Sequence, residues 1–103
     1  RATAGALMYR DDPLDDEMEL RALLGDEAVD QLAEGPTVAE RSPVEAAVDI
    51  LRVLLGWVSE ASAARWFQSA QRRLDDRSPL EVLAAGAFED VEEAARSWVA
   101  AQG

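Results

Sequence analysis

The chain has 103 residues, of which 49% are hydrophobic, enough for one small domain with a single core. Its 21 acidic and 10 basic side chains give a net charge of −11, and it contains no histidine, cysteine or lysine. This composition excludes disulfides, thiolate or imidazole metal sites and a histidine-dependent catalytic triad, and it disfavours contact with duplex DNA. No apolar run approaches the roughly 20 residues that span a bilayer, and no signal-peptide pattern opens the chain, so we expect no membrane contact.

The charge is unevenly distributed along the chain. Residues 1–40 carry a net charge of −8, whereas residues 41–103 carry −3. The boundary falls near the turn-forming residues Gly35, Pro36 and Pro43. We therefore predict an acidic N-terminal segment over residues 1–40, with one or two short helices, followed by a compact helical domain over residues 41–103.

The acidic segment carries two helical patterns. Residues 1–10 have no clear pattern and are expected to be mobile. Asp12 and Pro13 are typical of a helix start, and the helix that follows ends at Gly25, with apolar residues at roughly helical spacing: Leu14, Met18, Leu20, Leu23 and Leu24. A short second helix is predicted over residues 26–34.

The next helix begins with a capping box, in which a serine hydroxyl and a glutamate carboxylate satisfy backbone amides reciprocally, at Ser42-Pro43-Val44-Glu45. It carries a wide apolar stripe, which indicates packing on more than one side: Ala47, Ile50, Leu51, Leu54, Leu55 and Val58. One small chain is not expected to cover such a stripe fully, which makes a homodimer plausible. A further helix then contains Ala63, Ala64, Trp66 and Phe67.

Residues 68–77 are polar, and Leu74 alone continues the apolar pattern there. A second capping box at Ser78-Pro79-Leu80-Glu81 starts a very short helix, which Gly86 closes with a left-handed backbone. A last helix runs from about residue 89 to 100, with four residues on one side: Val91, Ala94, Ala95 and Trp98. No alternating run predicts a strand, so the expected fold class is all-α, a small bundle of five to six short helices with no sheet.

Clusters of carboxylates are the obvious candidates for enzyme chemistry. General acid–base catalysis needs carboxylates held apart in a shaped pocket, whereas sequence neighbours on a helix point in different directions. The clusters also lie at or near predicted helix starts, where capping explains them. We therefore predict no enzymatic activity and no metal or cofactor. The alternative, which this interpretation disfavours, is a small hydrolase that uses Asp75 and Asp76.

Aromatic and basic residues offer candidates for binding. Trp66 is predicted to lie in the core, whereas Trp98, near the chain end, fits a core position or an interaction surface equally well. The basic cluster consists of three arginines, Arg72, Arg73 and Arg77. These guanidinium groups either contact phosphates or carboxylates of a partner or pair with the neighbouring Asp75 and Asp76 on a solvated loop.

The segment from residue 66 onward has a recognisable order: a Trp, a Leu eight residues later, a Ser-Pro-Leu-Glu helix start, a Gly that closes this helix and a Val in the last one. The residues are Trp66, Leu74, Ser78, Pro79, Leu80, Leu83, Gly86 and Val91. In this order the chain resembles the C-terminal toxin-binding domain of the MbcA/ParS/Xre antitoxin family. The preceding residues 46–67 also resemble that family, and the likeness covers roughly residues 43–98.

The resemblance implies a cytoplasmic bacterial antitoxin without enzymatic activity or cofactor. Such proteins bind a cognate toxin, typically a RES-type NAD-consuming or ADP-ribosyl-transferring enzyme, and neutralise it by covering its active-site cleft. An acidic inhibitor would be attracted to a cleft lined with arginine. By this analogy the motif residues form the scaffold, residues 96–103 make the contact with Trp98 as anchor, and the partner-binding residues are Arg72, Arg73, Arg96, Trp98 and Gln102.

Most members of the family carry an N-terminal helix-turn-helix that binds DNA. Residues 1–40 show no basic recognition helix, so this chain as given is not expected to bind DNA, and a DNA-binding part either lies upstream of Arg1 or is missing. The alternative function is that of a non-enzymatic adaptor or assembly module acting through the acidic N-terminal segment. Binding of that kind would weaken steeply with salt and would require residues 11–34.

Overall fold

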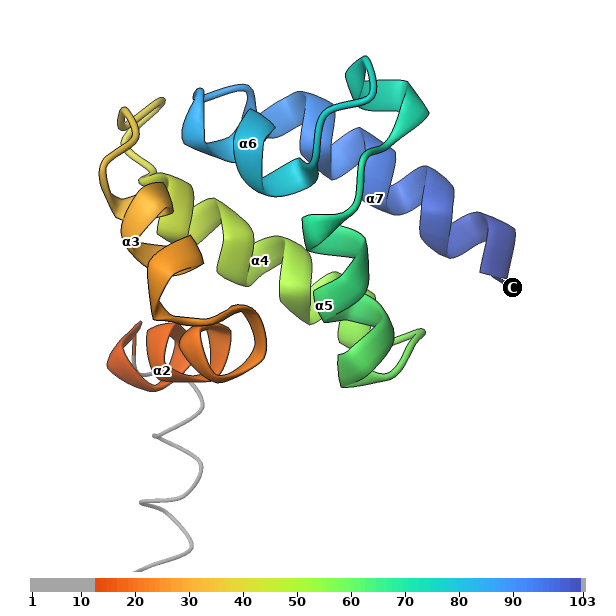
Figure 1. Ribbon diagram of the computed structural model, residues 1–103, viewed down its shortest axis with the longest axis horizontal. Helices are drawn as coiled ribbons and strands as arrows, with labels where there is room; N and C mark the ends of the chain where they lie inside the picture. Colours follow the sequence, from red (N-terminus) through yellow and green to blue (C-terminus); the bar gives the residue numbers. More distant parts are fainter. Residues whose placement is uncertain (1–12, 103) are drawn as a thin grey trace, which may run out of the picture.

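The computed structural model describes residues 13–102, and their side chains from residue 16 onward (Figure 1). Predictions about residues 1–10 and the cap at Asp12 lie outside the described residues. The described part forms six α-helices and one 3-10 turn, without a β-strand: α2 (Pro13–Leu24), α3 (Asp26–Ala33), α4 (Pro43–Leu55), α5 (Glu60–Gln68), η1 (Arg72–Leu74), α6 (Pro79–Ala84) and α7 (Phe88–Gln102). The predicted all-α bundle is confirmed, and none of these helices is long and apolar enough to cross a bilayer.

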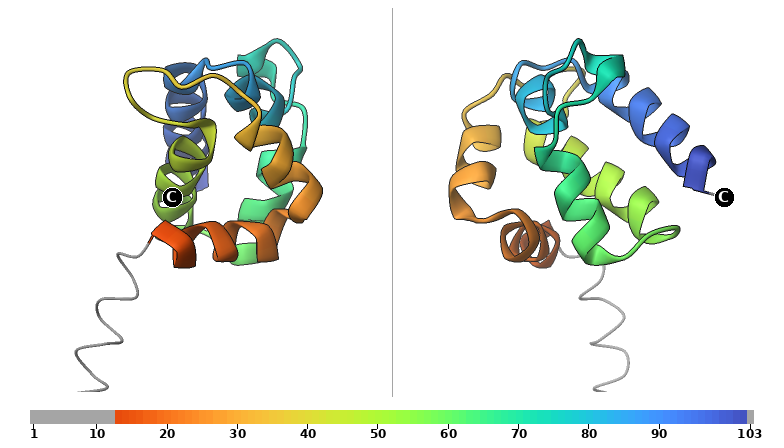
Figure 2. Two further views of the ribbon diagram at one scale, coloured as in Figure 1. Left: turned by 90° about the vertical axis from the view of Figure 1, so that its left-hand side faces the viewer. Right: turned by 45° about the vertical axis from the view of Figure 1, so that its right-hand side comes forward.

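Helix α4 is the centre of the bundle, and it packs against all five other α-helices (Figures 1 and 2). Its wide apolar face is buried by them: Ala46, Ala47, Val48, Ile50, Leu51 and Leu54. The width of the predicted stripe is therefore accounted for within one chain. Val53 is the large hydrophobic residue of α4 that stays exposed, at 46%.

The two helices of the acidic segment belong to the same core. Helix α2 packs on α4 and α5, and α3 packs on α4 and α6. Leu20, Val29 and Leu32 are completely buried in these contacts. The segments before and after residue 40 thus differ in charge, but both contribute to one hydrophobic core. Met18 departs from the predicted apolar pattern, because it lies on the outer side of α2 and is 65% exposed.

Arginines compensate part of the negative charge where these helices meet. Arg21 of α2 pairs with Glu17 at 3.1 Å, with Asp26 at 3.2 Å and with Asp30 at 2.9 Å. The last two carboxylates belong to α3, so the guanidinium bridges the sharp turn between the helices at Gly25, whose φ is +96°. One cation therefore holds three carboxylates of the acidic segment.

The shared core makes a clear prediction about stability. Replacing the fully buried Leu20 by alanine removes core contacts and leaves a cavity, and we expect a loss of about 2–5 kcal/mol in the free energy of unfolding. The matched control is Met18→Ala in the same helix, which should change this free energy by less than about 0.5 kcal/mol. Denaturant unfolding followed by circular dichroism measures both. An equally small effect of Leu20→Ala would show that α2 is not part of the core.

Candidate functional site

Helix α6 starts at the second capping box, as the sequence predicted. The Ser78 hydroxyl accepts a hydrogen bond from the Glu81 backbone N–H at 3.2 Å, and Glu81 Oε1 accepts one from the Ser78 backbone N–H at 3.0 Å. Hydrogen bonds from the backbone and then the side chain of Ser78 lower the pKa of the Glu81 carboxyl. Ser42 and Glu45 form the same reciprocal pair at the start of α4.

Gly86 reverses the chain between α6 and α7. Its φ is +93°, which confirms the predicted left-handed conformation. A Cβ atom at this position would lie 3.0 Å from Pro36 Cγ and 3.3 Å from Val38 Cγ2. Glycine is therefore needed for both its backbone conformation and its small size. Because the loop after α3 packs against this corner, the N-terminal part of the chain helps to fix the direction of α7.

Helix α7 is held along most of its length by one apolar face and one cation. The buried face consists of Phe88, Val91, Ala94, Ala95 and Val99. Arg41 Nη2 donates to Asp49 of α4 at 3.0 Å and to Glu92 of α7 at 3.1 Å. Its guanidinium also lies 5.8 Å from the centre of the Phe88 ring. Arg41 thus ties the two longest helices together.

The residues of the antitoxin-like motif occupy structural positions. Trp66 and Leu74 are 3% exposed, and Leu83 and Val91 are fully buried. Pro79 is buried in the first turn of α6 and Leu80 is partly buried against the core. Together with the cap residue Ser78 and the corner residue Gly86, they set where α6 begins and how α7 leaves it. Their predicted position as a scaffold agrees with this geometry.

The predicted contact residues of α7 lie on different sides of the helix. Trp98 is partly buried and stacks on Trp66 with ring centres 5.8 Å apart, so it has both a core contact and an accessible part. Arg96 is exposed and lines a hollow between α4 and α7 with Val53. Gln102 is exposed in the last turn, where its Nε2 donates to the Trp98 carbonyl at 3.4 Å.

The other two predicted contact residues, Arg72 and Arg73, lie in η1 and are exposed. Arg73 lines a shallow hollow with the first half of α7, beside Asp90 and Glu93. This hollow is separate from the one that contains Arg96. The structure therefore does not gather the five predicted contact residues into one cluster.

The loop after η1 differs from the expected network of ion pairs. Asp75 and Asp76 are exposed and both have a left-handed backbone, with φ of 60° and 63°. Neither pairs with the neighbouring arginines within the described residues, so the alternative in which they neutralise this basic cluster is wrong. The same exposure gives the two carboxylates no shaped pocket for hydrolysis. Over the described range, no group of three or more acidic residues is placed to hold a metal ion.

Trp57 is an exposed aromatic residue outside the predicted set of contact residues. It follows Gly56 directly after α4 and is 65% exposed. A weak signal for this exposure was present in the sequence: Trp57 lies outside the predicted apolar stripe, which continues from Leu55 to Val58. The loop that carries Trp57 and the last turn of α7 lie at the same end of the molecule (Figures 1 and 2).

Comparison of the chain with models of known protein families, with curated proteins and with solved structures found no significant match. The antitoxin-like motif therefore stays an interpretation of the residues themselves.

The Gly86 corner can be tested by substitution. Gly86→Ala forces a side chain into a left-handed position and against Pro36, and we expect it to reduce the free energy of unfolding by about 1–3 kcal/mol. Gly56→Ala is the control, because its φ is −73° and its Cβ would meet only the Val53 carbonyl oxygen at 3.4 Å. That variant should be neutral or up to about 1 kcal/mol more stable. Thermal unfolding of both proteins gives the comparison, and equal effects would contradict the assigned role of Gly86.

The second capping box predicts a pH dependence. Because the pKa of Glu81 is lower in the folded protein than its ordinary value of 4.5, its carboxylate stabilises the fold above that ordinary value. This contribution is lost as the pH falls through the lowered folded-state pKa. Glu81→Gln keeps a hydrogen-bonding side chain without the charge, so it should be less stable than the wild type at pH 6 and similar to it at pH 2–3. Urea unfolding at several pH values measures the difference, and a difference independent of pH would refute the assignment.

Proposed function

We propose that this protein is a non-enzymatic, cytoplasmic, antitoxin-like inhibitor that binds a partner toxin with the C-terminal end of α7. In this proposal the toxin is a RES-type NAD-consuming or ADP-ribosyl-transferring enzyme, and the bound helix end covers its active-site cleft. The motif in residues 66–91 supports the proposal, because its residues occupy the positions that orient α7.

The observation that carries the proposal is the contrast between the two parts of α7. Residues up to Val99 contribute a buried face, whereas Ala100, Ala101 and Gln102 are exposed in the last turn. This end of the helix extends beyond the neighbouring elements (Figure 1). A helix end that is held from one side and free at its tip can enter a cleft with little loss of conformational entropy.

The charge of the chain supports rapid association with a basic cleft at long range. A net charge of −11 produces an attractive field for an enzyme whose nucleotide-binding site carries arginines. The alternative of an adaptor acting through the acidic segment has less charge available, since Glu17, Asp26 and Asp30 are all paired with Arg21.

The test is co-purification with the product of the adjacent gene, followed by an assay of NAD consumption. The wild-type chain should bind this product and suppress its activity, and deletion of residues 96–103 should abolish both. Because that deletion also removes Trp98 and Val99 from the core, a second variant lacking only residues 100–103 separates binding from folding. Thermal unfolding should show a near-native melting temperature for the shorter deletion, with weakened inhibition. Undiminished inhibition by both deletions would refute the proposed site, and failure of the wild type to bind would refute the proposed function.

A further inference from the structure

Helices α4 and α7 run side by side in the same direction, and successive turns of one helix contact successive turns of the other. Arg41 joins Asp49 to Glu92, and one turn further along each helix Val53 and Arg96 line a common hollow. Beyond that turn, the loop after α4 and the C-terminal end of α7 lie at the same end of the molecule (Figures 1 and 2).

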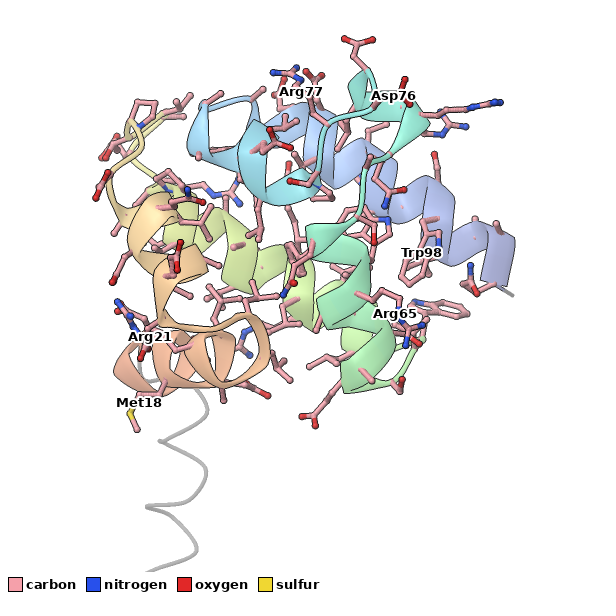
Figure 3. The ribbon with its side chains drawn as sticks, in the orientation of Figure 1. Met18, Arg21, Arg65, Asp76, Arg77 and Trp98 are labelled. Carbon is pink, nitrogen blue, oxygen red and sulfur yellow. The ribbon has the colours of Figure 1, made fainter. Side chains whose placement is uncertain are left out.

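This end of the molecule carries large apolar side chains that the fold leaves open. Trp57 is 65% exposed and Val53 is 46% exposed, and Trp98 is partly accessible on the side of α7 that stacks on Trp66 of α5. In the view of Figure 3, Arg65 of α5 and Trp98 of α7 lie toward the same side of the molecule. We call the set of Val53, Trp57, Arg65, Arg96 and Trp98 the tip surface. Exposed tryptophan and arginine are the residue types enriched in the energetic centres of protein interfaces.

The tip surface differs in charge from the rest of this strongly acidic chain. Residues 50–70 contain Glu60 as their single acid, and residues 94–102 contain none. Asp49 and Glu92, the carboxylates that border the hollow of Val53 and Arg96, are both bound by Arg41. Arg65 and Arg96 are exposed and form no ion pair among the side chains of residues 16–102. The tip surface therefore combines exposed apolar side chains, which we call its centre, with positive side chains, which we call its rim.

We infer that the tip surface docks into an apolar pocket bordered by carboxylates on the partner protein. This inference rests on the proposed function and adds the chemistry of the partner at the contact. The resemblance placed arginines of the partner at the contact. We instead expect carboxylates of the partner there, because this chain presents Trp57 together with Arg65 and Arg96. At long range, the −11 net charge of the chain attracts a positively charged partner. At the contact itself, positive side chains of this chain meet negative side chains of the partner.

Charge also distinguishes this partner from two other occupants. A second copy docked through the same face would place arginine rims against each other without carboxylates between them. A nucleic acid would be stacked by the tryptophans, but its phosphates would be repelled by the remaining acidic surface. A pocket with carboxylates at its border is the occupant that satisfies both the apolar centre and the positive rim.

The experiment uses the full chain and the product of the adjacent gene, with affinity measured by isothermal titration calorimetry. Trp57→Ala should weaken binding by roughly tenfold or more. The matched control is Met18→Ala, since Met18 is equally exposed at 65% on α2 at the other end of the molecule (Figure 3). Its affinity should equal that of the wild type. Thermal unfolding of both variants should leave the melting temperature unchanged.

The rim is tested by the double variant Arg65→Glu with Arg96→Glu, compared with Arg77→Glu, which reverses an exposed charge elsewhere (Figure 3). The double variant should bind more weakly, and its deficit should shrink as salt is raised, because screening removes the new repulsion. Wild-type affinity of the Trp57 variant, or tighter binding by the double variant, would overturn the inference while the proposed function stands. Failure of the wild type to bind would remove both.

Two further measurements test whether a second copy of the chain or a nucleic acid binds the tip surface instead. Sedimentation of the chain alone should give a monomer, and a dimer that Trp57→Ala dissociates would assign the tip surface to a second copy. A fluorescently labelled single-stranded oligonucleotide should not bind, and binding that depends on Trp57 would assign the surface to nucleic acid. Either result would overturn the inference.

Discussion

The burial of α4 on nearly every side is the constraint on which the rest of the structure depends. A chain of this size has room for one core, and α4 supplies its largest apolar face. Every other α-helix takes its position by covering part of that face. The acidic side chains are therefore directed outward, and arginines bind some of them at the junctions between helices. Arg21 joins α2 to α3, Arg41 joins α4 to α7, and Arg52 of α4 pairs with Asp16 of α2.

Local signals in the sequence predicted the elements well, because each depends on a few neighbouring residues. The boxes at Ser42 and Ser78 and the reversal at Gly86 are decided by hydrogen bonds and backbone angles within one or two turns. The sequence pattern placed Met18 wrongly on the apolar side of its helix and did not place Trp57, because the exposure of both depends on which neighbouring helix covers them. The same holds for Arg41, whose two carboxylate partners, Asp49 and Glu92, lie on different helices.

The structure shows where the predicted scaffold and contact residues lie, while their roles stay predictions. Trp66, Leu83 and Val91 are buried and could be inferred from apolar spacing alone. The five expected contact residues do not form one cluster, since Arg73 and Arg96 line separate hollows. Sequence order does not reveal the side of α7 that faces α4, and this side decides which exposed residues become neighbours of Val53 and Trp57.

The shared direction of α4 and α7 has an electrostatic consequence for the end of the molecule at which both helices finish. Each helix places the negative end of its macrodipole there, as a partial charge of about half an electron. Carboxylates at that end would add to two aligned negative poles, whereas cations oppose them. Arg52 in the last turn of α4 opposes the negative end of the helix dipole, and residues 94–102 contain no acidic side chain that would add to it. The local reversal of charge is thus favoured by the folded chain itself, before any other molecule is present.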